Sequence, residues 1–398
     1  MKFCKCSAKI ARIIAAFFLL LASGCLFAQN EDFKPYEIDV YKSRNKQKDF
    51  YLSEIAESVE YVKLGKSQGG MISYANVYPL DDYFVISDWR QPVMVFSLKG
   101  EYIRSIGSFG NGPGEYSTAF GFDIDPTNHI LYILNRNSRI LHAYDTDGTL
   151  IKSLDLPYQS GNLCVMKNGN ILIETLMNYK NDGCYPFCLL DTDGNLIREI
   201  KRPDLPEGKR MGFNPIPSFD RLSNGNVIVS NFARDTIYQI DLEGTLIPFA
   251  ILDLGKLMLP DKLYYDMVSF AQGEGLFNYI VGPGLRSVGK YLKLNHSYHR
   301  QSHVGIFDPS TRELYFLSPS ETEGMGFIND LDGGPTLWTH IHDEKYFCQR
   351  IEAIELIENR DFYASQKAKY PEKQKAFLEL IDSLQPDDNP VVMIVKLK

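Results

Sequence analysis

The sequence predicts an all-β fold, a six-bladed β-propeller closed by pairing of strands from its N- and C-terminal parts. First, a strand–turn–strand unit recurs at spacings of 48, 46 and 50 residues, measured between Gly100, Gly148, Gly194 and Gly244. Second, β-branched and aromatic runs fill each repeat, and a period of roughly 40 to 50 residues with several strands is typical of propellers. Third, a spare strand stands at each end of the array, over Val59–Leu64 and Val391–Leu397.

Each repeat unit has the local chemistry of a β-hairpin. In Tyr144-Asp145-Thr146-Asp147-Gly148, the first Asp can accept backbone N–H bonds and the Gly can supply the positive φ of the turn. A further strand precedes each unit, and these strands are predicted at 83–86, 130–134, 170–173 and 226–229. The units are therefore predicted to be successive blades of a ring.

The fifth and sixth units are less regular. Asp308 lies 67 residues after Asp241, so about twenty residues are inserted in the fifth unit, between 257 and 286. The sixth unit combines strands at 336–338 and 345–348 with a helical insertion at about 352–385 and the terminal strand. Pairing of Val59–Leu64 with Val391–Leu397 would remove the two open sheet edges of an unclosed ring.

Residues 1–28 are predicted to be an export signal. A basic region precedes Ile13–Ala22, an apolar run of ten residues that is too short to span a bilayer as a helix. Leu21-Ala22-Ser23-Gly24-Cys25 resembles a bacterial lipobox, with Ala22 where Leu is usual, and this predicts lipidation of Cys25. Cleavage after Ala28 is the alternative, so we expect a periplasmic or outer-membrane lipoprotein, or else a secreted protein.

The mature chain is acidic. Removing residues 1–24 takes away four basic and no acidic residues, which changes the net charge from −8 to −12. This charge disfavours nucleic acid as a partner. Membrane contact is expected only through a lipid anchor. Residues 29–52 are polar and are predicted to form a tether or an extended lead-in, and 53–398 are predicted to be one propeller domain.

Four cysteines remain in the mature chain besides Cys25. Export permits disulfides, and Cys164, Cys184, Cys188 and Cys348 allow three pairings. Cys164 and Cys188 lie in neighbouring predicted strands, so a disulfide between them and two buried thiols are both open alternatives. Cys184 and Cys188 would be half of a metal site, but no second Cys/His pair has matching spacing.

The most glycine-rich stretch runs from Ile106 to Tyr116, with the sequence IGSFGNGPGEY. It resembles the G-x-x-G-x-G-P-G-E-[YF] signature of six-bladed propeller lipoproteins of Bacteroides-type bacteria, related to NHL and TolB-like propellers. The segment Ile328–Pro335 and the Asn-Pro-led terminal strand extend the resemblance. The resemblance implies the fold and the exported location, and it implies no common reaction and no catalytic residues.

The same stretch has two interpretations. One is a rim loop that lets a ligand approach the backbone, with Glu115 and Tyr116 as contacts. The other, which the repeat favours, is a crossover between two blades that needs positive φ. A phosphate loop is not indicated, because no helix and no Lys-Ser/Thr pair follows.

Three histidines lie within eight residues, at His296, His299 and His303. On a helix they would share a face and could bind zinc. Their polar neighbours and the flanking strands favour the tip of a polar hairpin instead, or a polar binding rim. The prediction is therefore no metal site.

The strongest predicted binding site is the segment 329–342. Carboxylates beside an exposed aromatic residue would suit sugar hydroxyls or a cation, and a carboxylate pair could also serve a glycosidase. The alternative is a rigid turn that enters the sixth blade. The candidate ligand-binding residues of this segment are Asn329, Asp330, Asp332, Trp338, His340 and His342.

No complete catalytic constellation appears in the sequence. The sequence therefore favours a non-catalytic binding or interaction module, without a cofactor. Its ligand would be a glycan, a peptide or an envelope protein. The alternative is a metal-dependent lyase or hydrolase acting at the central channel, as in NHL and gluconolactonase-like propellers. That enzyme would use Asp330 and Asp332 with the histidines of the two segments. A structural subunit of an envelope complex is a third possibility.

Overall fold

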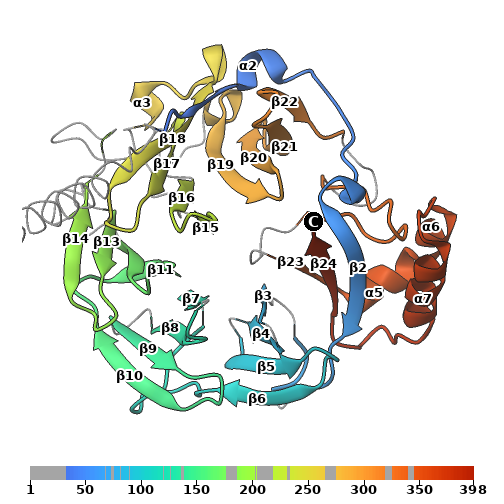
Figure 1. The fold of residues 1–398 in the computed structure, drawn as a ribbon, viewed down its shortest axis with the longest axis horizontal. Helices are drawn as coiled ribbons and strands as arrows, with labels where there is room; N and C mark the ends of the chain where they lie inside the picture. Colours follow the sequence, from blue (N-terminus) through green and yellow to red (C-terminus); the bar gives the residue numbers. More distant parts are fainter. Residues whose placement is uncertain are drawn as a thin grey trace, which may run out of the picture. The chain divides into compact units, whose positions relative to one another are not determined.

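The computed structural model describes residues 33–398, except 68, 73–75, 81, 89, 120, 126, 136–138, 176–185, 202, 204–217, 231–233, 265–274, 319–324 and 339–344. The chain divides into two units, Met1–Pro35 and Tyr36–Lys398. In the second unit, six small sheets are arranged in a ring (Figure 1). The six-bladed propeller predicted from the repeat is confirmed.

Blades 1 to 3 are antiparallel meanders in which the first strand lies nearest the middle of the ring (Figure 1). Blade 1 holds β3 (Asn76–Pro79), β4 (Tyr83–Ser87), β5 (Val93–Ser97) and β6 (Tyr102–Ile106). Blade 2 holds β7 (Gly121–Ile124), β8 (Leu131–Asn135), β9 (Ile140–Tyr144) and β10 (Leu150–Asp155). Blade 3 holds β11 (Ser160–Val165), β12 (Ile171–Thr175), β13 (Phe187–Leu190) and β14 (Leu196–Ile200).

Blades 4 and 5 keep this order, and blade 6 combines distant segments. Blade 4 holds β15 (Ser218–Arg221), β16 (Val227–Ser230), β17 (Thr236–Ile240), β18 (Leu246–Asp253) and, outermost, β1 (Tyr36–Asp39). Blade 5 holds β19 (Val281–Val288), β20 (Tyr291–Tyr298), β21 (Gln301–Asp308) and β22 (Glu313–Phe316). Blade 6 holds β23 (Tyr346–Ile351), β24 (Val391–Leu397) and β2 (Ala56–Lys63). The strand predicted at 336–338 is reduced to one bridge between Phe327 and Leu337.

The hairpin turns follow the predicted chemistry. Asp145 Oδ1 accepts a hydrogen bond from the Thr149 backbone N–H at 2.8 Å, and Gly148 has a φ of 86°. Asp191 accepts from Asn195 in the same way. These aspartates are therefore used as turn acceptors.

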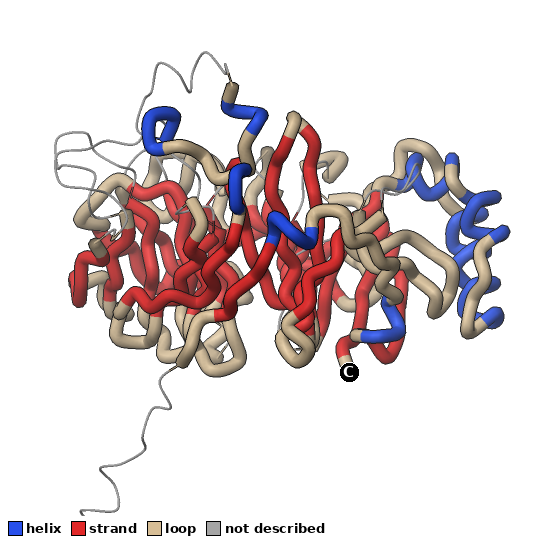
Figure 2. Tube along the Cα trace, turned by 90° about the horizontal axis from the view of Figure 1, so that it is seen from above, coloured by secondary structure: helices blue, strands red, loops and turns tan. Residues whose placement is uncertain are grey.

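The core lies in the seams between blades. Six hydrophobic clusters fill the six seams, because each blade packs face to face against both of its neighbours. The inner strands of a blade are consequently apolar on both faces, and β4 and β8 read as near-continuous apolar runs. Seen from the side, loops lie on both faces of the strand layer (Figure 2).

Blade 6 closes the ring, as predicted. β2 pairs antiparallel with β24, with Val59 opposite Val395 and Lys63 opposite Val391. β23 pairs with the other edge of β24. The last strand of the chain is thus held between one strand from each end of the domain.

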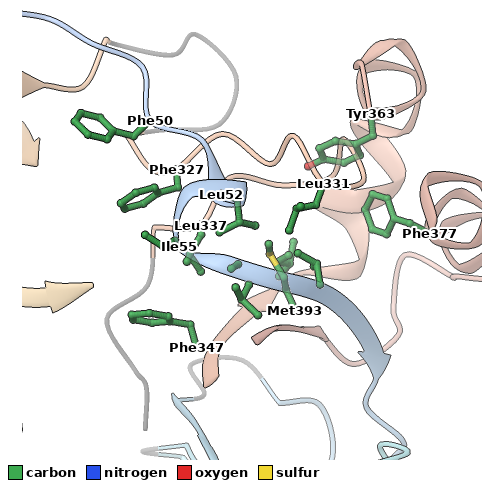
Figure 3. Packing of buried hydrophobic residues seen from close by; sticks show 14 of the residues in the cluster. Phe50, Leu52, Ile55, Phe327, Leu331, Leu337, Phe347, Tyr363, Phe377 and Met393 are labelled. Carbon is green, nitrogen blue, oxygen red and sulfur yellow. The ribbon is translucent and has the colours of Figure 1, made fainter. Parts of the chain in front are cut away.

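The predicted helical insertion packs on blade 6. It consists of α5 (Ala353–Glu358), α6 (Arg360–Ser365) and α7 (Pro371–Asp382). Tyr363 and Phe377 belong to the same hydrophobic cluster as Met393 of β24 and Leu52 (Figure 3). The insertion therefore extends the core of the closing blade.

From residue 36 onward, the segment predicted to be a tether or lead-in packs on the propeller. β1 adds to β18 as a parallel fifth strand, and Gln47 and Tyr51 form parallel bridges with Phe316 and Ile328. Apolar side chains spaced among polar ones explain this contact, because Ile38, Val40, Phe50 and Leu52 are all buried. The segment predicted to be an export signal, with Cys25, lies outside the described residues. No described helix has the length and apolar character to cross a membrane.

The three described cysteines, Cys164, Cys188 and Cys348, are buried. Cys164 and Cys188 form no disulfide with each other, and Cys184 lies outside the described residues. Burial raises the pKa of Cys188 to about 12, so its thiol stays protonated at neutral pH. The structure thus shows the buried-thiol alternative for Cys164 and Cys188.

We expect Met393→Ala to destabilise the protein by about 2–5 kcal/mol, because it removes a fully buried side chain from the closing strand. Lys396→Ala on the same strand is the control, since its side chain is 51% exposed and its pair with Glu57 lies at the surface. Urea unfolding of both variants gives the comparison. Equal stability of the two variants would show that the β2–β24 pairing carries little of the fold.

Candidate ligand-binding site

The acidic turn at 329–334 is buried in the closing blade. Asp332 is 1% exposed, and its Oδ1 accepts hydrogen bonds from Asn329 Nδ2 at 2.7 Å, the Gly334 N–H at 3.0 Å and the Tyr61 hydroxyl at 3.1 Å. Burial raises the pKa of Asp332 although these donors favour the charged form. This carboxylate holds the turn against β2.

Asp330 holds the same turn against Ser53, which directly follows the lead-in. Its carboxylate accepts from the Ser53 backbone N–H at 2.9 Å and from the Ser53 hydroxyl at 2.6 Å. The rigid-turn alternative therefore accounts for both carboxylates and for Asn329. Ligand binding by these three residues stays a prediction, and it would compete with the contacts that close the ring.

Trp338 is the exposed member of the predicted site. Its side chain is 51% exposed, its backbone N–H donates to Gln349 Oε1, and its carbonyl accepts from Lys293 Nζ. His340 and His342 lie outside the described residues. Trp338 thus brings an accessible indole to the seam between blades 5 and 6.

The loop 107–116 connects blades 1 and 2 and is braced by its own side chains. Tyr116 is fully buried, donates to the Ile106 carbonyl at 2.6 Å and accepts from the Val93 N–H. Glu115 accepts from the Gly112 N–H at 2.7 Å. Gly107 has a φ of 62°, and a Cβ there would lie 2.8 Å from Tyr116 and Tyr144. The geometry is that of the crossover alternative, and the ligand contacts predicted for Glu115 and Tyr116 remain untested.

The histidine segment forms a long hairpin. His296 and His303 are opposite one another on β20 and β21, with ring centroids 5.3 Å apart, and His299 lies in the exposed turn. His296 Nδ1 and His303 Nε2 are buried without a hydrogen-bond partner among the described residues. Burial and the neighbouring His303 lower the pKa of His296 to about 4. The described residues contain no group of three side chains that could hold a metal.

An ion pair joins three blades near the middle of the ring. Arg221 of blade 4 donates two bonds to Asp123 of blade 2, at 2.8 and 3.1 Å, and one to the Val165 carbonyl of blade 3 at 2.9 Å. Burial alone would lower the pKa of Arg221, but Asp123 reverses the effect and the pKa rises. This pair has a structural role, because both terminal nitrogens of Arg221 donate to the Asp123 carboxylate.

The seam between blades 5 and 6 has no comparable ion pair among the described residues. Arg286 of β19 and Lys293 of β20 are directly opposite one another. Lys293 is 9% exposed, and burial together with Arg286 lowers its pKa to about 8. Within the described part of the chain, neither cation forms an ion pair. Positive charge and hydrogen-bond donors therefore gather here without matching acceptors.

Sequence reasoning missed Arg286 and Lys293. The available signal was Lys293 itself, which interrupts the apolar strand Tyr291-Leu292-Lys293-Leu294. A charged residue at a strand position with apolar neighbours on both sides is uncommon without a partner. Its position opposite Arg286 depends on a hairpin register that the repeat alone does not specify.

Six blades closed by terminal strands define the molecule as a β-propeller, and its candidate site is a cationic seam beside an exposed indole. The chain belongs to the DUF4934 family, described as a domain of unknown function, whose profile matches residues 35–396. No curated protein matches the sequence.

Several solved structures share the fold. A Bacteroides fragilis protein whose name presents it as exported aligns with a TM-score of 0.66 at 16% identity, over 92% of this chain and 100% of its own. A DUF4221 family member from Bacteroides vulgatus gives a TM-score of 0.50 at 11% identity, over 86% and 97%. Virginiamycin B lyase from Staphylococcus aureus gives 0.40 at 14% identity, over 66% and 74%. The two Bacteroides structures support the propeller fold, and at these identities they show the fold alone.

We expect Asp123→Asn to destabilise the protein by about 2–4 kcal/mol, because it leaves the Arg221 guanidinium without its counter-ion. The control is Asp147→Asn, which removes a surface pair with Arg104, since Asp147 is 80% exposed. Surface pairs contribute about 0–1 kcal/mol. Denaturant unfolding measures the loss of stability in both variants. A loss in Asp123→Asn no larger than in Asp147→Asn would contradict a structural role of the Asp123–Arg221 pair.

We expect stability to fall as the pH is lowered from about 6.5 toward 4, because the unfolded chain protonates His296 in this window and the folded protein does not. The slope approaches about 1.4 kcal/mol per pH unit. His296→Leu should flatten the profile relative to wild type, whereas His299→Asn in the exposed turn should retain the slope. Identical slopes for all three proteins would refute the assignment to His296.

Proposed function

We propose that this protein is an exported binding module rather than an enzyme, and that it holds its ligand at the seam between blades 5 and 6. The observation that carries the proposal is the exposed Trp338, whose backbone carbonyl accepts from Lys293, a buried cation without an ion pair among the described residues. Indole rings combine a large apolar face with a polar edge and are enriched in binding surfaces. The ligand class is a glycan, a peptide or an envelope protein.

The proposed location is the cell envelope. A basic and apolar N-terminal segment, the lipobox-like sequence before Cys25 and the similarity to an exported Bacteroides protein support it. We propose that Cys25 is lipidated and anchors the propeller to a membrane. The acidic mature charge agrees with a partner other than nucleic acid.

A metal-dependent lyase or hydrolase remains the second class in principle, but no specific observation favours it. The carboxylates Asp330 and Asp332 are engaged in closing the ring. His296 and His303 lie on the face of blade 5 that is turned to blade 4, beside Phe316. The residues proposed for such chemistry are therefore not gathered at one place within the described structure.

We expect the mature protein to bind a subset of immobilised glycans or peptides, and Trp338→Ala to weaken that binding by at least tenfold, because it removes the accessible aromatic contact. Tyr370→Ala is the matched control, since Tyr370 is an exposed aromatic residue on the helical insertion. Glycan and peptide arrays followed by calorimetry provide the measurement. Equal affinity of Trp338→Ala and wild type would refute the seam as the binding site.

A further inference from the structure

Two cations share one face of blade 5. Arg286 and Lys293 are opposite residues of an antiparallel pair, so their side chains project to the same side. That side is turned to blade 6, because Lys293 Nζ donates to the Trp338 carbonyl and the neighbouring Val288 and Tyr291 pack in the blade 5–6 cluster. Like charges placed directly opposite destabilise a sheet.

No carboxylate of the described residues forms an ion pair with either of these cations. Arg286 donates to the Phe219 carbonyl at 3.3 Å, and its nearest acidic influence is Asp220, whose Oδ2 accepts from the Ser287 N–H instead. Arg221, by contrast, has the Asp123 carboxylate in a two-bond pair. Blade 5 therefore keeps a buried Lys293 and a partly buried Arg286 without an ion pair, whereas Arg221 of blade 4 is paired with Asp123 of blade 2. Buried charges ordinarily have a counter-ion.

A third group on this face also lacks a partner. Asn295 follows Lys293 by two residues on β20, so it lies on the same face of the strand. Its Oδ1 is buried and has no hydrogen-bond partner among the residues that the structure describes. The two ends of an amide can be exchanged by a flip, so the group can offer either an acceptor or N–H donors at this position. An unpaired buried amide is costly and points to an absent partner.

We propose that Arg286, Lys293 and Asn295 bind the carboxylate of an acidic sugar, a hexuronate, whose ring lies against Trp338. This proposal rests on the binding function proposed for the same seam. A carboxylate supplies the missing negative charge and accepts from guanidinium, ammonium and amide donors at once. Lys293 Nζ donates to the backbone carbonyl of Trp338, and the exposed side chain of Trp338 offers a flat apolar surface to a sugar ring.

The combination of groups narrows the ligand class. Inorganic phosphate would neutralise the two cations but would make no contact with the indole. A neutral sugar would contact the indole but would leave the cations without a counter-ion. An acidic peptide carries carboxylates, but an extended peptide usually adds backbone hydrogen bonds along a free strand edge. The cations lie instead on a face of blade 5 that blade 6 covers.

Calorimetry of the mature protein with galacturonate and trigalacturonate tests the proposal. Galactose, oligoglutamate and inorganic phosphate are the comparison probes. We expect binding of the uronates with at least tenfold preference over every comparison probe. Lys293→Met should lower uronate affinity by about 10- to 100-fold, because it removes a charged hydrogen-bond donor. Lys290→Met, an exposed lysine three residues earlier, should bind like wild type.

A second variant keeps the test independent of the folding of Lys293→Met. Asn295→Asp would place a carboxylate of the chain itself beside the two cations. We expect a higher Tm than wild type together with loss of uronate binding. A lower Tm with retained uronate binding would overturn the proposal.

The remaining outcomes distinguish failure of the carboxylate site from failure of the general binding function. Loss of galactose and uronate binding in Trp338→Ala, with unchanged affinities in Lys293→Met, would overturn the carboxylate site and leave the binding function in place. Tighter binding of oligoglutamate than of uronate would overturn the sugar assignment. Failure of wild type to bind either uronate would overturn the inference, whereas glycan or peptide binding on arrays would still support the general function.

Discussion

The pairing of β2 with β24 is the constraint on which the rest of the structure depends. A ring of sheets has two open edges unless strands from both ends of the domain share a blade, and here Val59 lies opposite Val395. The contacts of Asp330 with Ser53 and of Asp332 with Tyr61 hold the adjoining turn against this closure. The acidic turn is consequently buried where a ligand-binding loop would be exposed.

The middle of the ring depends on a second constraint. Inner strands bring polar side chains from different blades together, and these groups must be paired because few waters can replace a missing partner. Blades 2, 3 and 4 meet this requirement through Asp123 and Arg221. Blade 5 does not meet it at Arg286 and Lys293. The seam between blades 5 and 6 thus carries two cations without an ion pair among the described residues, near the exposed Trp338.

The sequence predicted the architecture, but it did not indicate the contacts around the candidate site, for one physical reason. Glycine turns such as Gly148, apolar runs and terminal strands such as Val391–Leu397 are local signals, and a repeat multiplies them. Register and seam contacts are not local. They decide that Asp332 is buried and that Lys293 lies opposite Arg286. The parallel strand β1 was missed because its few apolar residues lie in a polar segment and gain their burial only from blade 4.

Among the described residues, the cations of the blade 5–6 seam have no ion-pair partner. The most direct test of this is the titration of the Lys293 side chain in the ligand-free protein, followed by NMR with labelled lysine and assigned with a Lys293 variant. We expect a pKa of about 8, because burial and Arg286 disfavour the charged form. A pKa near the ordinary lysine value of about 10.4 would contradict it, because it would mean that the ammonium is solvated or already paired with a carboxylate.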